Sequence, residues 1–283
     1  MNSDLLQVPP RVSYHEGMLL DSSDFKDEQQ HHRRRLAGVL ARLHGCGTVA
    51  GLKVEKIAKG DPLPGGKTAD EDKLAVQPGV AIDRAGRPLE VPTTRCLRLD
   101  RWFNAIAAAG PAVLQPLLTG AERRLVADVF LRYLEVPHSL RPGFPKAGQD
   151  ATDAIVSSRL TDGFELLLAP RSAENGTPPV PARPYQPAPG TRQELLAAIY
   201  NAYQPVSGPG EYPVAPMNDT PAGTPIQKLS ERTAVFLARV LIRLEDAPST
   251  TLRRHAAGAF SIEDEHRLVL PAAELLLGLT ALA

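Results

Sequence analysis

The pattern of hydrophobic and polar positions predicts a long amphipathic helix at residues 22–43. A short polar side chain among residues 21–23 can cap its start, and Gly45 and Gly47 end it. We expect its inward-facing stripe to pack against the rest of the protein. That stripe recurs at three- and four-residue spacing and consists of Phe25, His32, Leu36, Val39, Leu40 and Leu43.

Alternating apolar positions predict short β-strands after the helix. Residues 83–87 between two of them are predicted to form a hairpin turn, in which Gly86 takes a positive φ. The loop at 59–72 is polar, and we expect it to be exposed. The predicted strands are residues 48–57, 73–77, 80–83, 88–91 and 95–99.

Residues 124–135 have the strongest strand pattern, because they are apolar on both faces. A strand of that kind usually lies at the centre of its sheet. A predicted helix at 100–109, which carries the only tryptophan, Trp102, precedes it, and a strand at 164–168 follows.

Prolines divide the second half of the chain. Seven of them lie within residues 170–190, which predicts a linker with polyproline character, and a second proline-rich stretch covers 205–225. Between the two, Thr191 and Glu194 have the spacing of a capping box and begin a predicted helix at 191–203. The last predicted elements are a strand at 234–245, whose length also permits a helix, a strand at 266–270 and a helix from residue 272.

These elements predict an α+β fold, in which an N-terminal amphipathic helix packs on a mainly antiparallel β-sheet with proline-rich arms. Pro9 and Pro10 block a helix at the start of the chain, so an extended arm is expected there. The predicted division is an extended arm at 1–20, a helix and β-sheet domain at 21–169, a proline-rich linker at 170–190 and a smaller α+β region at 191–283.

Composition and charge indicate the compartment of the protein and the classes of partner that it does not attract. The 283 residues have a formal net charge of zero, so there is no global attraction to nucleic acid or to an anionic membrane. Two cysteines, Cys46 and Cys96, do not make a disulfide framework, which favours a reducing compartment. No signal-peptide pattern is evident, and the apolar run at 268–283 is short for a membrane span. We therefore expect synthesis in the cytoplasm and no membrane insertion.

Few residues are arranged for chemistry. The histidines at 31–32, His44 and Cys46 lie close in sequence, yet they lack the second ligand pair of a zinc site. Cys46 follows the end of the predicted helix, where the helix dipole disfavours a thiolate. The acidic runs at 70–72 and 263–265 lack the spacing of a calcium loop, and we interpret them as solvated surface. We predict no catalytic residue, no metal site and no cofactor.

The basic run Arg33-Arg34-Arg35 lies on the predicted helix together with Asp27 and Glu28, which can pair with basic residues across its surface. Binding of single-stranded nucleic acid usually interleaves aromatic side chains with basic ones, and none interleave here. A solvated or partner-facing surface is therefore expected, not a nucleic-acid site.

Two blocks of the sequence resemble a known family. The first contains Tyr14, Gly17, the helix motif Asp24-Phe25 with Glu28-Gln29, and HGCGTVAGLKV at 44–54. The second, at 76–92, is similar to the pattern V-x-PG-x-AID-x-x-GR-x-(I/L)-x-V-P. Both resemble a family of uncharacterised, baseplate-associated proteins of phage-tail-like contractile injection systems. The family typically has aromatic or branched residues where Cys46 and Thr48 stand here, a departure that concerns packing.

The resemblance implies a non-enzymatic structural subunit of a phage-tail-like particle, present in several copies and in contact with other baseplate or tail subunits. The alternative is a peripheral tail-associated module that recognises a cell-surface glycan or protein. A hydrolase would require a histidine–carboxylate pair, for which His138, His255 and His266 are the candidates. The residues expected at interfaces are Tyr14, Met18, Arg33, Arg34 and Tyr185, and those expected at structural turns are Gly45, Gly47, Gly51, Gly79 and Gly86.

Overall fold

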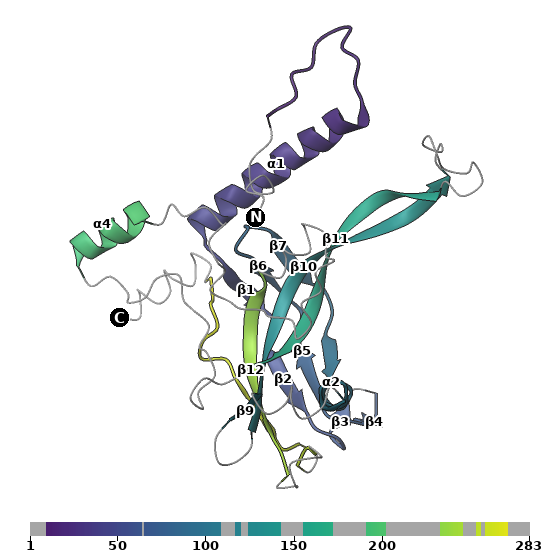
Figure 1. The fold of residues 1–283 in the computed structure, drawn as a ribbon, viewed down its shortest axis with the longest axis vertical. Coiled ribbons are helices and arrows are strands. Elements are labelled where there is room, and N and C mark those ends of the chain that lie inside the picture. The colour runs from purple at the N-terminus through teal and green to yellow at the C-terminus, as the bar shows by residue number, and fades with distance from the viewer. Residues whose placement is uncertain are drawn as a thin grey trace.

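The computed structural model has an N-terminal helix followed by several mostly antiparallel β-sheets, which confirms the predicted α+β class (Figure 1). The structure describes residues 10–63, 65–108, 117–119, 124–142, 155–171, 191–201, 233–245, 253–255 and 258–270. In this part of the chain, no helix combines the length and the apolar character needed to cross a membrane.

The helices and strands follow the predicted order closely. Their bounds are α1 (Ser22–Leu43), β1 (Gly47–Gly51), β2 (Val54–Ile57), β3 (Pro62–Leu63), β4 (Lys67–Thr68), β5 (Lys73–Val76), β6 (Gly79–Ile82), β7 (Pro88–Val91), β8 (Arg95–Arg98), α2 (Leu99–Ala107), β9 (Leu118–Thr119), β10 (Arg124–Pro142), β11 (Ile155–Pro170), α4 (Arg192–Asn201), β12 (Val235–Arg243) and β13 (Phe260–Glu263).

β10 is an inner strand of the largest sheet, as its two apolar faces predict. The sheet has the antiparallel order β11-β10-β12-β13, and β9 also pairs with β10. Val129 of β10 lies opposite Leu168 on one side and Ala238 on the other. The register of β12 then shifts by one residue, so Leu237 forms a bulge, and the strand interpretation of residues 234–245 is confirmed.

The predicted strand at 48–57 is wrong as a single element. Gly51 and Leu52 both have positive φ, of 62° and 58°, and they turn the backbone sharply between β1 and β2. A Cβ on Gly51 would lie 2.1 Å from the carbonyl oxygen of Pro78, so only glycine fits there. β1 joins the sheet β1-β6-β7, whereas β2 joins the sheet β2-β5-β8, and Leu52 between them is fully buried.

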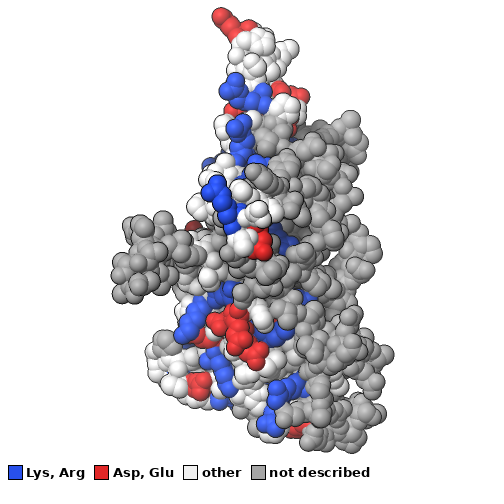
Figure 2. All heavy atoms as spheres, turned by 90° about the vertical axis from the view of Figure 1, so that its left-hand side faces the viewer, with Lys and Arg blue, Asp and Glu red and all other residues white. Residues whose placement is uncertain are grey.

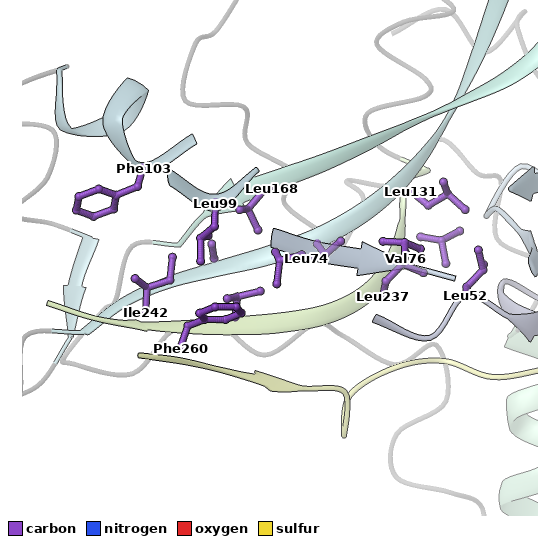
Figure 3. Close-up of a cluster of buried hydrophobic side chains, with 14 of the residues drawn as sticks. Leu52, Leu74, Val76, Leu99, Phe103, Leu131, Leu168, Leu237, Ile242 and Phe260 are labelled. Carbon is purple, nitrogen blue, oxygen red and sulfur yellow. The ribbon is translucent and has the colours of Figure 1, made fainter. Parts of the chain in front are cut away.

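One continuous core lies between the five-stranded sheet and the two three-stranded sheets (Figure 3). Val129 and Leu131 of β10 meet Leu74 and Val76 of β5 in this core, and α2 adds Phe103. Residues on both sides of the predicted linker at 170–190 therefore share a sheet and a core. The linker itself, apart from Pro170 and Arg171, lies outside the described residues.

The opposite face of the large sheet is also buried. Phe130 packs against Phe236, with ring centroids 5.8 Å apart. Beside this pair, the carboxylate of Asp128 accepts hydrogen bonds from Arg171 at 2.7 Å and from Arg239 at 2.8 Å, and all three side chains are buried. Two guanidinium groups thus share one carboxylate. This pairing was not predicted, because the three residues lie on different strands or beyond a strand end.

The predictions for the C-terminal strands are less accurate than those for the rest of the chain. Residues 266–270 do not form a strand; Val269 makes a single parallel bridge to Thr48. β13 was not predicted, although it pairs with β12 from Arg239 to Ile242.

The capping box of α4 is confirmed, because Thr191 Oγ1 accepts from the Glu194 amide at 3.3 Å and Glu194 accepts from the Thr191 amide at 3.1 Å. The predicted helix after residue 272 and the stretch 205–225 lie outside the described residues.

Candidate assembly interface

α1 begins at a well-formed cap. Asp21 Oδ1 accepts hydrogen bonds from the amides of Ser23 and Asp24, at 2.6 and 3.3 Å, and Asp24 Oδ2 accepts from the Asp21 amide at 2.9 Å. The carboxylates lie at the N-terminal end of the helix, where its dipole favours negative charge. The preceding segment, residues 10–20, contains no helix or strand.

The expectation that the apolar stripe of α1 packs inward is wrong. No α1 residue is buried, and Phe25, Leu36, Val39 and Leu43 remain 49–74% exposed. A different face of the helix approaches the protein, where Ala37 lies beside Gly86 of the hairpin turn. At about 100° per residue, the stripe lies roughly a third of a turn away from that contact. The structure therefore leaves the stripe uncovered among the described residues.

The turn between β6 and β7 fits closely under α1. Gly86 has a φ of 79°, and a Cβ added there would lie 1.7 Å from the carbonyl oxygen of Ala37. Asp83 forms the turn by accepting hydrogen bonds from the amides of Ala85 and Arg87 at 2.9 and 2.8 Å. The predicted hairpin is confirmed, and its glycine also allows the helix to approach.

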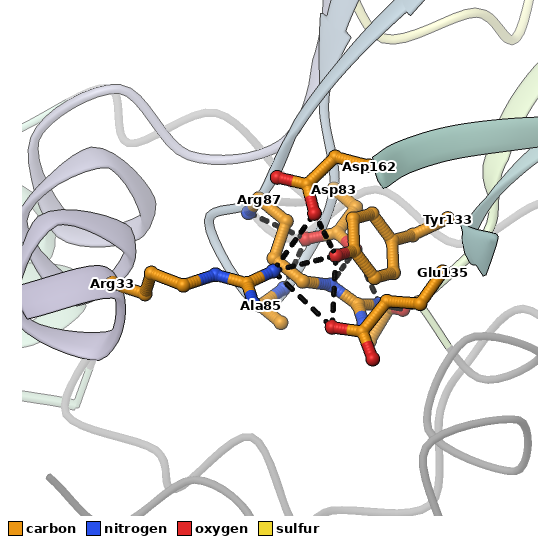
Figure 4. A network of polar contacts seen from close by, with 8 residues as sticks. Arg33, Asp83, Ala85, Arg87, Tyr133, Glu135 and Asp162 are labelled. Atoms are coloured by element: carbon orange, nitrogen blue, oxygen red, sulfur yellow. Dashed lines mark hydrogen bonds and ion pairs between the residues drawn. The ribbon is translucent and has the colours of Figure 1, made fainter. Parts of the chain in front are cut away.

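A polar network ties α1 to the large sheet (Figure 4). The Arg33 guanidinium donates to the hydroxyl of Tyr133 at 2.6 Å, to Asp162 at 3.0 Å and to Glu135 at 3.2 Å. The Tyr133 hydroxyl in turn donates to Asp162 at 2.6 Å. One helical side chain thus contacts both β10 and β11.

Arg87 packs against Tyr133, the central residue of this network. Its guanidinium lies 4.3 Å from the ring centroid of Tyr133 and forms an ion pair with Asp83, which is buried. Burial raises the pKa of Tyr133, and the hydrogen bond to Asp162 adds to the rise. Tyr133 therefore remains a neutral donor at physiological pH. Its hydroxyl can link Arg33 to Asp162 without adding a third negative charge.

Beyond this network, β10 and β11 leave the body as a two-stranded ribbon (Figure 1). We name residues 135–142 and 155–162 the β arm. Val136 pairs with Thr161 and Leu160 pairs with Pro137. Successive pairs point to opposite faces of a ribbon, so the exposed side chains of Val136 and Leu160 place an apolar group on each face. The other large apolar side chains exposed on the arm are Leu140, Ile155 and Val156.

An isolated two-stranded ribbon is at best marginally stable in water. Among the described residues, no strand pairs with the outer edges of the β arm, because β12 pairs with β10 only as far as Leu131 and β11 is an outer strand. Pro137 and Pro142 have no amide hydrogen, so each interrupts the row of hydrogen-bond donors along β10. The edges are thus partly protected, whereas the apolar faces are not.

The residues considered as metal ligands are not gathered into a metal site in the described part of the chain. No group of three or more histidine, cysteine, aspartate or glutamate side chains could hold a metal ion there. Burial raises the pKa of Cys46, which disfavours its thiolate, although Arg84 opposes this effect. The hollow beside Cys46 has a volume of about 10 Å³, room for about one water molecule.

The surface interpretation of the acidic run at 70–72 is wrong for its last member. The side chain of Asp70 is 72% exposed, but Asp72 is fully buried. Asp72 accepts from the amides of Lys59 and Gly258 at 2.8 Å each and from the guanidinium of Arg254. It joins the loop at 59–72, which also contains β3 and β4, to a distant part of the chain.

The predicted interface residues are placed as follows. Tyr14 is half exposed, Met18 and Arg34 are partly exposed, and Tyr185 lies outside the described residues. The side chain of Arg33 is 48% exposed, although its guanidinium is held within the protein. Sequence reasoning missed the β arm because the predicted strands stopped at Glu135 and began at Phe164. Pro137, Pro142 and the polar residues between them conceal the continuing strand.

The predicted turn glycines fall into two groups. Gly45, Gly47, Gly51 and Gly86 have positive φ, whereas Gly79 does not. A Cβ on Gly79 would instead lie 2.3 Å from the carbonyl oxygen of Ala50.

Comparison of the chain with protein-family models, with curated proteins and with solved structures finds no match.

Proposed function

We propose that this protein is a non-enzymatic structural subunit of a phage-tail-like contractile injection particle, associated with the baseplate. Its partners are other baseplate or tail subunits, and several copies enter a symmetric assembly. It is made and assembled in the cytoplasm as part of a particle that can be released. The family resemblance at residues 14–92 suggests this setting.

One observation carries the proposal. The body has a continuous core, yet two anchored projections, α1 and the β arm, expose large apolar side chains. Contiguous exposed apolar surface of this kind marks an interaction site more often than a solvated surface. Because the Arg33 network joins the middle of α1 to the base of the β arm, both projections are preorganised for contact, and less conformational entropy is lost on binding.

The proposal is tested by asking whether the protein sediments with particles from its native host. Lysate is separated on a density gradient, the fractions are assayed by mass spectrometry, and the same fractions are imaged by negative-stain electron microscopy. We expect the protein to be enriched together with sheath and tube proteins. If it stays at the top of the gradient as a free monomer and is absent from every particle fraction, the proposal fails.

A further inference from the structure

We propose that the β arm of one copy docks on the N-terminal part of α1 in a second copy of the same chain. We name this surface the acidic end; it comprises residues 16–28, which are the first turns of α1 and the segment directly before it. This inference names one partner contact within the proposed assembly and rests on the proposed function only in treating the chain as an assembly subunit. Three properties of the described residues support it: charge, exposed apolar area and position.

The described β arm is basic beyond the Arg33 network. Residues 136–142 and 155–161 contain Arg141 and Arg159 but no aspartate or glutamate. Both arginines are exposed, and no described residue forms an ion pair with either guanidinium. They lie among Leu140, Val156 and Leu160, which are 53–73% exposed. The arm therefore offers positive charge on an apolar surface; the residues that join its strands, 143–154, lie outside the described part.

The acidic end has the opposite charge on a similar apolar surface. Residues 16–28 contain five carboxylates and one lysine. The apolar side chains there include Leu19, which is 94% exposed, and Phe25, which is 54% exposed. Acidic side chains lie at the apex of the molecule in Figure 2, where the segment before α1 reaches its highest point. The two surfaces are thus complementary in sign and both retain uncovered apolar area.

Tyr14 lies close to two carboxylates of the acidic end, Glu28 and Asp24. Its pKa is raised, first by desolvation and then by the nearby negative charges of Glu28 and Asp24. The same negative charges would attract a guanidinium group. Glu28 already accepts from His32 at 3.1 Å, but its side chain remains 27% exposed.

The two surfaces do not meet within one chain. In Figure 1 the outer part of the β arm and the segment before α1 project from the same end of the body and are clearly separated. Because the docking surfaces are different patches of the same chain, the contact is heterologous. Repetition of a heterologous contact generates a closed ring or an open helical array. A ring of copies would suit a subunit that surrounds a tail.

The test is sedimentation velocity of the purified full-length protein over a range of concentrations and salt. We expect reversible association that weakens at high salt, because the contact uses exposed charges. The variant Arg141→Glu/Arg159→Glu and the variant Glu16→Lys/Glu28→Lys should each weaken association about tenfold. The control Lys53→Glu/Arg101→Glu reverses two basic side chains on the body and should associate like the natural protein.

Charge rescue gives the decisive comparison. A chain that carries all four interface reversals should regain association, because its arm and its acidic end are complementary again. Mixing the two single-surface variants should also restore association, because the reversed arm of one complements the reversed acidic end of the other and their two natural surfaces complement each other. Failure of the four-fold variant to regain association, with folding verified by circular dichroism, would overturn the inference.

The proposed function and this inference can fail separately. A natural protein that remains monomeric at all concentrations overturns the docking of one copy on another, whatever its gradient profile. If that monomer nevertheless co-sediments with particles, the structural role stands and the arm contacts a different subunit. Docking of the arm on the acidic end of its own chain would give a monomer with an intramolecular cross-link between Leu160→Cys and Phe25→Cys, and would also overturn the inference.

Discussion

Asp72 is a buried carboxylate that connects two distant parts of the chain. Burial would raise its pKa, but the hydrogen bonds from Gly258 and Lys59 and the guanidinium of Arg254 outweigh that effect, and its pKa is lowered. A carboxylate with a lowered pKa in the folded state stabilises the fold at pH values above its ordinary pKa of about 4. That contribution is lost as the pH falls through the folded-state pKa.

We therefore expect Asp72→Asn to reduce the free energy of unfolding by about 1–3 kcal/mol at neutral pH. Below about pH 4 the gap between the variant and the natural protein should narrow. Urea denaturation at a series of pH values measures both effects. The control is Asp70→Asn, because Asp70 is largely exposed and forms an ion pair with Lys73 at the surface. An equal loss at pH 7 and pH 3 would contradict the assignment.

Gly86 allows a second prediction at this scale. Gly86→Ala should destabilise the protein by about 2–4 kcal/mol, because the strain of a positive φ adds to a collision with the Ala37 carbonyl. Gly60→Ala is a matched control, since Gly60 has a φ of 94° and an added Cβ would meet no atom within 4 Å. Thermal unfolding compares the two. If both variants lose the same stability, the approach of α1 is unimportant.

Single residues were predicted well where the signal was local. The positive φ of Gly86 followed from the turn DRAG within residues 83–87. The partner of Arg33 could not be predicted, because Tyr133 lies 100 residues further along the chain. Burial of Asp72 was missed for the same reason: its position in an acidic run is visible in the sequence, whereas its donors come from residues 254 and 258.

At the scale of elements, the periodicity of apolar residues predicted most helices and strands, but it did not predict which of their faces are buried. An amphipathic stripe indicates that one face of a helix will be buried. It does not indicate whether the residues that bury this face belong to the same chain or to a partner. α1 illustrates this limit, because its stripe is exposed. The break between β1 and β2 was hidden because Leu52 continues an alternating apolar pattern, even though its backbone has turned.

The β arm and the core should respond differently to loss of an apolar side chain. Leu160→Ser on the arm should change the free energy of unfolding by less than about 0.5 kcal/mol, because Leu160 is 61% exposed. Leu131→Ala in the core should cost about 2–5 kcal/mol, because Leu131 is fully buried. Urea denaturation of the two variants gives the comparison. A large loss of stability in Leu160→Ser would mean that the arm is part of the folded core.

At the scale of the whole molecule, the last described strands complete the structure that the middle of the chain begins. β12 covers one edge of β10, and Val235, Leu237 and Ile242 enter the shared core. A chain truncated after residue 232 would leave that edge and core face open. The described fold is therefore expected to require residues from both ends of the sequence.

We expect the chain truncated after residue 232 to lose its cooperative thermal transition and to bind the apolar dye ANS. A chain that lacks residues 1–20 keeps every described strand and is the control. Calorimetry and dye fluorescence measure the two outcomes. A cooperative transition in the chain truncated after residue 232 would show that the first part folds without β12.

The pairing of β10 with β12 also has a consequence for synthesis. Leu131 and its partner Val235 are about 100 residues apart. At about 5–20 residues per second, a ribosome needs roughly 5–20 s to make the intervening chain. During that time the inner edge of β10 is open and its apolar face is uncovered, which is a state prone to aggregation. The yield of soluble protein should therefore depend on chaperones that hold the nascent chain until β12 emerges.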